Sequence, residues 1–216
     1  MANIRFIEEG HIYLLDETYV LPSVSEILKF IFHDKYKGID KEILNRKADF
    51  GTKVHRVIEL SEQSSPISPT NSFASVNDEI YKEFAELLKN MYVEASFNQY
   101  KKLVKKYNIE VLEQEQIVSY ENIFAGRLDM IGNVDGCYSL LDIKTTADLD
   151  KEYLSWQLSL YELALGKQFE KLYCIWLPKK ELGQLVEIER INKIDLVNKI
   201  EEFKKHRDME VKNEYS

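Results

Sequence analysis

Hydrophobic residues recur with two different periods along this chain, and the change of period separates the expected strands from the expected helices. Aromatic and β-branched residues in Phe6–Leu15 and Tyr19–Leu21 predict a small N-terminal hairpin. Ser23 is followed three residues later by Glu26, which is the capping-box pattern that opens a helix. Apolar residues at three- and four-residue spacing then predict further helices.

Two helical regions are expected next. Asp40–Leu60 has a helical pattern, and one interpretation of it is two helices that meet near Phe50 and Gly51. Asn77–Tyr107 carries a second apolar stripe, which changes phase and therefore predicts a kink or break near Ser96–Asn98.

The second half of the chain mixes strands and helices. Asp135-Gly136 is a turn-favouring pair between two apolar segments and predicts a hairpin. The expected elements are strands at Glu110–Tyr120, Phe124–Gly132 and Tyr138–Lys144, a helix at Tyr153–Gly166, strands at Leu172–Leu177 and Gln184–Arg190, and a closing helix at Ile194–Arg207.

Two aspartates and a lysine fall on the predicted hairpin. Residues two apart in a strand share a face, so Asp142 and Lys144 project side by side, about 7 Å apart along the strand. The hairpin can bring Asp129 close to Asp142, so that two carboxylates and one ammonium converge at one sheet edge. Such a set suits a hard divalent cation, with the lysine orienting water or neutralising charge. The alternative is three exposed strand charges that share no role.

These residues also lie in motifs that resemble a known family. Gly126-Arg127-Leu128-Asp129, Leu141–Thr146 and Gln157–Tyr161, in this order, resemble the motifs of the PD-(D/E)xK nuclease superfamily. Within it they resemble the RecB-type branch, although Leu128-Asp129 stands where the usual pattern is Pro-Asp. The resemblance implies an α/β fold with a restriction-endonuclease-like core, in which α-helices flank a central mixed β-sheet. An N-terminal hairpin and helical additions would complete a single domain over residues 1–216.

The resemblance also implies roles for individual residues. One or two Mg²⁺ or Mn²⁺ ions would be held by His55, Glu115 (with Glu113 as the fallback), Asp129, Asp142 and the backbone carbonyl of Ile143. Lys144 would activate water or stabilise the transition state, and Gln157 and Tyr161 would support Lys144 and the substrate. An imidazole ligand would favour Mn²⁺ over Mg²⁺. The structural alternatives are a core histidine, an edge-strand glutamate and an ordinary polar helix face.

The net charge of −8 excludes a generic basic nucleic-acid binder. Contacts with DNA must then come from local patches, and the candidates are Lys101, Lys102, Lys105 and Lys106, the basic end at Lys204–Arg207, and Arg127 beside the first aspartate. For the lysine runs, a solvated helix face is the alternative.

Only two cysteines occur, which argues against a disulfide scaffold and against the four-cysteine iron–sulfur cluster of several RecB-type relatives. No apolar run is long enough to span a membrane, and the N-terminus lacks the apolar core of a signal peptide, so the cytoplasm is the expected compartment.

The expected function is metal-dependent hydrolysis of DNA phosphodiester bonds. A stand-alone exonuclease of phage or mobile-element type, acting in recombination or end processing, is favoured. Three alternatives stay open: a structure-specific or nicking endonuclease on the same site, a non-catalytic DNA- or protein-binding module on a nuclease fold, and an acidic interaction domain. A recombination or single-strand-annealing partner and a homo-oligomer also stay open.

Overall fold

The computed structural model describes residues 4–35, 41–63 and 78–214, and a five-stranded mixed sheet forms its centre. The strands lie side by side in the order β4 (Glu110–Tyr120), β5 (Phe124–Val134), β6 (Cys137–Lys144), β7 (Lys171–Trp176) and β8 (Gln184–Glu187). The pair β6–β7 is parallel and the other three pairs are antiparallel. A parallel pair needs a long crossover, which α5 (Lys151–Leu165) supplies.

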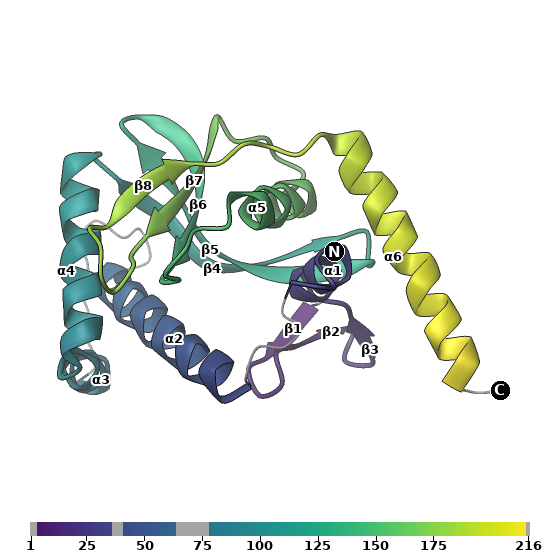
Figure 1. Ribbon diagram of the computed structural model, residues 1–216, viewed down its shortest axis with the longest axis horizontal. Helices are drawn as coiled ribbons and strands as arrows, with labels where there is room; N and C mark the ends of the chain where they lie inside the picture. Colours follow the sequence, from purple (N-terminus) through teal and green to yellow (C-terminus); the bar gives the residue numbers. More distant parts are fainter. Residues whose placement is uncertain (1–3, 36–40, 64–77, 215–216) are drawn as a thin grey trace.

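Helices cover both faces of this sheet (Figure 1). On one face, α1 (Val24–Ile31), α5 and α6 (Lys193–Glu214) enclose a core with the strands. On the other face, α2 (Lys41–Gln63) and α4 (Met91–Lys106) form a second core, against which α3 (Asp78–Leu88) packs. The layered arrangement confirms the predicted α/β fold.

Strand β6 contributes side chains to both cores. Leu140 packs with the α1–α5–α6 layer, whereas Leu141 and Ile143 pack with the α2–α4 layer. Because side chains alternate along a strand, Asp142 and Lys144 are directed to the side that α5 covers. The sequence pattern predicted this alternation correctly.

The N-terminal segment forms a separate three-stranded antiparallel sheet, of β1 (Ile4–Ile7), β2 (Ile12–Leu15) and β3 (Tyr19–Leu21). The prediction of a single hairpin therefore missed one strand. Phe6–Leu15 covers part of β1, the whole of β2 and the turn between them, where Gly10 has a φ of +86°. The capping box was predicted correctly: the Glu26 N–H donates to Ser23 Oγ, and the Glu26 carboxylate accepts the Ser23 N–H at 2.7 Å.

A single helix, α2, runs through Phe50 and Gly51, so the alternative of two helices meeting there is wrong. Gly51 lies inside the helix, where a glycine lowers stability without interrupting the backbone hydrogen bonds. A Cβ atom at Gly51 would lie 3.4 Å from Thr145 Oγ1, so α2 passes next to the end of β6.

The break predicted near Ser96–Asn98 is also wrong, because the chain breaks at Asn90, between α3 and α4. The Asn90 side chain accepts the Tyr92 N–H at 3.0 Å and so caps α4. Ser96 is buried although it is polar, and it continues the stripe of Val93 and Phe97. A buried serine made a continuous stripe look interrupted in the sequence.

The turn predicted at Asp135-Gly136 joins β5 to β6, and both residues have positive φ angles, of 48° and 85°. Positive φ at both central positions is the geometry of a type I′ hairpin turn. Within the described ranges, no helix combines the length and the apolar character that a bilayer crossing requires.

Candidate active site

The candidate site lies where the neighbouring strands β5 and β6 separate. Their ladder ends at the pair Met130–Leu141, and beyond it the Asp129 Oδ2 atom accepts the Ile143 N–H at 2.7 Å. A carboxylate thus takes the backbone donor that a continued ladder would use. Because β6 is the middle strand of the sheet, the acids lie in the interior of the sheet, which corrects the expectation that they meet at one sheet edge.

Asp142, which is buried, and Lys144, which is partly exposed, form an ion pair on β6. Asp142 is 1% exposed, and Lys144 Nζ lies 2.5 Å from its Oδ2 atom. The Asp142 Oδ1 atom has no hydrogen-bond partner among the described residues. Leaving a buried carboxylate oxygen without a partner is unfavourable, and a bound cation would relieve it.

The pKa values of both residues in this pair are raised. Burial raises the pKa of Asp142, repulsion from Asp129 raises it further, and the Lys144 ammonium only partly opposes the change. For Lys144, burial opposes the charged form, but the carboxylates of Asp142 and Asp129 outweigh it and raise its pKa. Lys144 is therefore a protonated cation at neutral pH.

A second group of side chains surrounds Asp129. His55 from α2, Glu115 from β4 and Asp129 from β5 each offer one ligand atom, and these atoms all lie within 4.8 Å of one another. His55 Nδ1 is 3.5 Å from Asp129 Oδ1, and His55 Nε2 donates to the Ile143 carbonyl at 3.0 Å. Asp142 is not a member of this group.

This set of donor atoms fits a divalent metal ion. Carboxylate and carbonyl oxygens are ligands for Mg²⁺, and an imidazole nitrogen extends the set toward Mn²⁺. His55, Glu115, Asp129 and the Ile143 carbonyl adjoin one another, and Asp142 presents an unpartnered oxygen on the strand beside Asp129.

Glu115 reaches the site through an unusual backbone. Its φ is 50°, in the left-handed region, which residues other than glycine adopt rarely. The flanking pairs Gln114–Met130 and Gln116–Leu128 place it opposite Asp129. Burial, and then repulsion from Asp129, raise its pKa to about 7. The structure therefore brings Glu115 to Asp129, whereas Glu113, the fallback, is exposed.

Arg127 connects Glu115 to the N-terminal sheet. Its Nε atom lies 2.8 Å from Glu115 Oε2, and its guanidinium carbon lies 4.8 Å from the centre of the Phe6 ring. A guanidinium over an aromatic face is a favourable cation–π contact. Sequence reasoning missed Phe6, because the alternation that predicts its strand does not reveal a contact so distant in the sequence.

Gln157 and Tyr161, one turn apart on α5, close the site on the side of Asp142. Gln157 Nε2 lies 3.4 Å from the Tyr161 hydroxyl, and burial raises the pKa of Tyr161 well above its usual range. Gly126 makes this packing feasible, because a Cβ atom there would lie 2.6 Å from Tyr161 Cε1 and 2.9 Å from Val24 Cγ2. The position that begins the Gly-Arg-Leu-Asp motif is thus a glycine because Tyr161 packs directly against it.

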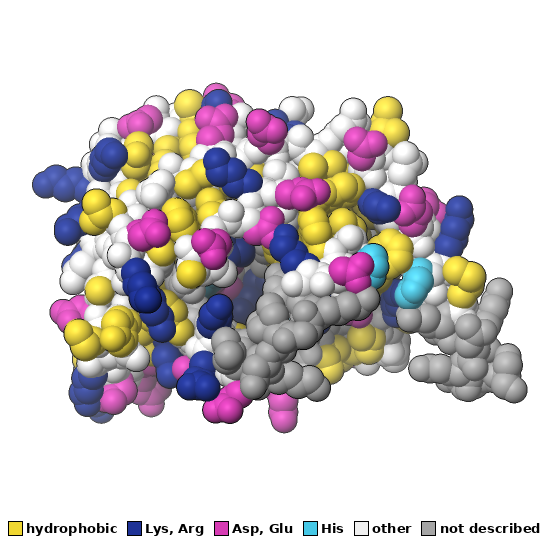
Figure 2. All heavy atoms as spheres, in the orientation of Figure 1, with side chains coloured by type: hydrophobic (Ala, Val, Ile, Leu, Met, Phe, Trp, Pro, Cys, Tyr) yellow, Lys and Arg dark blue, Asp and Glu magenta, His cyan; other side chains and the backbone are white. Residues whose placement is uncertain are grey.

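The four lysines of α4 are not part of this cluster. The structure places α4 against α2 and α3 (Figure 1). Its lysines Lys101, Lys102, Lys105 and Lys106 are exposed. The ammonium groups of Lys101 and Lys106 lie over the nearby Phe97 and Tyr107 rings. Figure 2 shows basic and acidic side chains interspersed over the face in view. A DNA-contacting role for these lysines stays a prediction.

Comparison with solved structures gives distant similarities. An alkaline exonuclease (LHK-Exo) from Laribacter hongkongensis is 13% identical over 74% of this chain and 89% of that chain, with a TM-score of 0.41. LHK-Exo in complex with dAMP is 15% identical over 76% and 93%, with a TM-score of 0.40. SSO0001 is 16% identical over 82% of each chain, with a TM-score of 0.34. At these TM-scores the similarities assign neither substrate nor activity.

Comparison at the level of sequence is more specific. No curated protein matches the chain. The family model of the PD-(D/E)XK nuclease superfamily, however, matches residues 28–207, which span α2, the whole five-stranded sheet and α5. All the side chains of the candidate site except Phe6 and Val24 fall inside that match. The chain therefore belongs to the PD-(D/E)XK nuclease superfamily.

Proposed function

We propose that this protein is a metal-dependent deoxyribonuclease and that it acts as an exonuclease of the RecB type on linear DNA. The observation that carries the proposal is that the Asp142–Lys144 pair lies on the strand next to Asp129, which itself groups with His55 and Glu115, within a chain of this superfamily. Superfamily membership supports nuclease activity. The exonuclease assignment rests on the Gln157–Tyr161 helix motif that the chain shares with the RecB-type branch.

Each residue has a distinct part in the proposed reaction. His55, Glu115, Asp129, Asp142 and the Ile143 carbonyl would hold one or two Mg²⁺ or Mn²⁺ ions. Bound ions of this kind lower the pKa of water and neutralise charge on a phosphate. Lys144 stays protonated, because two carboxylates stabilise its ammonium form. We therefore assign it to orienting the attacking water and stabilising negative charge on the phosphate, and not to a role as general base.

Gln157 and Tyr161 position the other groups. The Gln157 Oε1 atom is buried and has no hydrogen-bond donor among the described residues, so it is able to accept from water or from a substrate-bound group. Tyr161 stays neutral because burial raises its pKa, so its hydroxyl can donate a hydrogen bond.

The test is incubation of the purified protein with linear duplex and with single-stranded DNA, in Mg²⁺, Mn²⁺ or EDTA. Asp129→Ala, Asp142→Ala and Lys144→Ala should each abolish cleavage while the thermal unfolding transition is retained. Lys167→Ala removes an exposed lysine just beyond α5 and serves as the matched control with unchanged cleavage. Near-normal hydrolysis by any of the three site variants would show that the assigned site is wrong.

A covalently closed circular duplex distinguishes the two nuclease classes. An exonuclease needs an end and leaves the circle intact, whereas a structure-specific or nicking endonuclease cuts it. Binding of DNA with no cleavage in either metal would instead indicate a non-catalytic module on a nuclease fold.

A further inference from the structure

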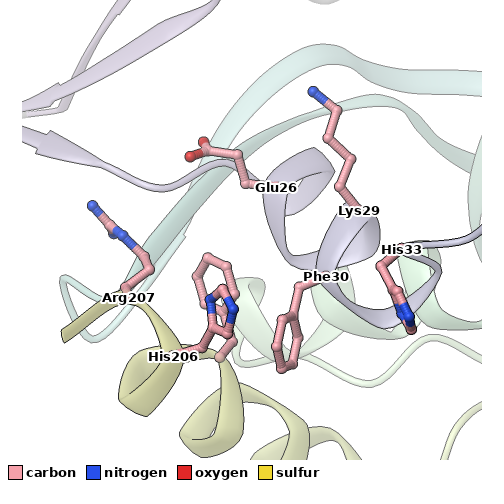
Figure 3. A pocket seen from close by; sticks show the side chains of 7 residues that line it. Glu26, Lys29, Phe30, His33, His206 and Arg207 are labelled. Carbon is pink, nitrogen blue, oxygen red and sulfur yellow. The ribbon is translucent and has the colours of Figure 1, made fainter. Parts of the chain in front are cut away.

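Helices α1 and α6 enclose a groove on the side of the molecule away from α4 (Figure 1). Its cavity is ≈ 570 Å³, within the roughly 300–1,000 Å³ range of sites that hold small ligands. Figure 3 shows the side chains that line it, which include Glu26, Lys29, Phe30, His33, His206 and Arg207. Neither the proposed reaction nor the metal ligands make use of this groove.

The groove carries more positive than negative formal charge although the protein is acidic. Lys29 and Arg207 line it with a single carboxylate, Glu26, and two histidines, whereas the whole chain carries a net charge of −8 with histidine counted as neutral. Its carboxylate, Glu26, already accepts the Ser23 N–H and hydroxyl in the capping box, and His33 lies 2.8 Å from Asp34. Lys29 and Arg207 form no ion pair with another described residue. The charge of the groove therefore favours an anionic occupant.

Aromatic rings lie between these cations. The Phe30 ring is 5.2 Å from the His206 ring and 5.7 Å from that of Phe203, centroid to centroid. In Figure 3, Phe30 and His206 come from the two different helices and face each other. Phe30 is only partly buried, so part of its ring is accessible. Cations combined with accessible rings are the features with which proteins hold single-stranded nucleic acid, because unpaired bases stack on rings and phosphates bind the cations.

The groove is connected to the candidate active site through α1. Ser23, the N-cap of α1, forms a β-bridge with Ala125, and Val24 abuts Gly126, three residues before Asp129. Lys29 in the groove and Arg127 in the site both lie close enough to His11 to act on it electrostatically: burial lowers the pKa of His11, Arg127 and Lys29 lower it further, and Glu26 opposes them. His11 is therefore near both the groove and the site.

We propose that the α1–α6 groove binds a single-stranded DNA tail that extends from the active site. The inference rests on the proposed nuclease function, and it adds a single-strand site that lies outside the metal cluster. Bases would stack on Phe30 and His206, and phosphates would contact Lys29 and Arg207. A blunt duplex would not use the groove, because its bases are paired and stacked within the helix.

The experiment measures binding of fluorescent DNA by anisotropy, in EDTA. The ligands are a blunt duplex, the same duplex with an oligo-dT tail at either end of one strand, and a tailed duplex whose tail is abasic. The variants are Phe30→Leu, which keeps an apolar side chain but removes the ring, and the double change Lys29→Glu with Arg207→Glu. The matched control is Lys82→Glu with Lys167→Glu, which alters the net charge equally at exposed residues outside the groove.

The wild type should bind one of the tailed duplexes more tightly than the blunt one. Phe30→Leu should weaken binding of that dT tail about 5- to 150-fold, as expected for the loss of one stacked base, and leave the abasic tail and the blunt duplex unaffected. The double charge reversal should reduce the slope of log K against log salt by about 1.4 for the tailed duplex, since each single-strand phosphate contact contributes about 0.7. The control should bind like the wild type.

Equal affinity of the wild type for blunt and tailed duplexes, or equal tail affinity in wild type and groove variants, would overturn the proposal. A change of oligomeric state in the variants with unchanged DNA binding would also overturn it, and would assign the groove to a protein contact. These outcomes are independent of cleavage. If the wild type cleaves linear duplex but binds a tailed duplex no more tightly than a blunt one, the proposed nuclease function stands and the groove proposal fails. If it binds the tail but does not cleave, the groove proposal stands and the proposed nuclease function fails.

Discussion

Replacement of Gly126 by alanine tests how closely α5 and β5 are packed at the site. The added Cβ would lie 2.6 Å from Tyr161 Cε1 and 2.9 Å from Val24 Cγ2, and both partners are buried. Neither ring nor valine can rotate away freely, so the backbone or the tyrosine must shift. Overpacking of this kind destabilises a core by about 1–3 kcal/mol. For a chain of this length the melting temperature should fall by about 2–12 °C.

The assay combines thermal unfolding with cleavage of linear DNA, and Gly51→Ala is the matched control. Gly51 also adjoins the site, but its added Cβ would make an ordinary contact 3.4 Å from Thr145 Oγ1. Because Gly51 lies inside α2, alanine there should stabilise the protein by up to about 1 kcal/mol. Cleavage should persist in Gly51→Ala and fall by up to about a hundredfold in Gly126→Ala, since Tyr161 is displaced from the site.

A double-mutant cycle shows whether the clash is the cause. In a Tyr161→Ala background the ring is gone, so Gly126→Ala should destabilise the protein less than in the wild type, with a coupling of at least about 1 kcal/mol. If Gly126→Ala leaves the melting temperature and cleavage unchanged, or if the two substitutions are additive, the packing argument is refuted.

Three further predictions concern charge. Burial raises the pKa of Asp142 to about 6. The contribution of this residue to the free energy of unfolding is therefore fully present below about pH 4 and is lost as the pH rises through 6. In EDTA, Asp142→Asn should therefore match the wild type near pH 4 and exceed its stability above pH 7, by at most about 3 kcal/mol in urea melts; equal stability at pH 7 would contradict this reasoning. A bound ion should stabilise the fold by about 2.7 kcal/mol at a hundredfold excess over its Kd, and Mn²⁺ should raise the melting temperature more than Mg²⁺ does. A His55→Ala variant that keeps this difference would show that His55 is a core residue and not a ligand. Reversal of the four α4 lysines, Lys101 to Lys106, should reduce the salt slope of duplex binding in Ca²⁺ by more than one, and an unchanged slope would make them a solvated face.

Features encoded within a few residues were predictable from the sequence. The alternation along β6 separates Asp142 and Lys144 from Leu141 and Ile143, and the capping box places the start of α1 correctly. The position of Asp129 opposite Asp142 follows from the Asp135-Gly136 turn, because a two-residue hairpin loop sets the register of its strands.

Features that depend on distant contacts were not predictable from local patterns. His55 lies beside Asp129 only because α2 packs under the sheet, and its candidacy came from the family resemblance alone. The exact place of the helix break was hidden because tertiary packing buries the polar Ser96. The family resemblance favoured Glu115 over Glu113, but only the strand register, with the flanking pairs Gln114–Met130 and Gln116–Leu128, brings Glu115 opposite Asp129.

The contact between Arg127 and Phe6 has a consequence for how this protein can be shortened or recombined with its relatives. Phe6 and Val24 lie outside residues 28–207, the part that the superfamily shares, yet one packs on the guanidinium that holds Glu115 and the other forms the wall behind Gly126. A chain cut to residues 28–207 would keep every acidic and basic group of the site but would lose the surfaces that keep two of them in place. Transplanting residues 28–207 into another member of the superfamily would therefore require the first two dozen residues to accompany them, or a substitute that packs in the same positions.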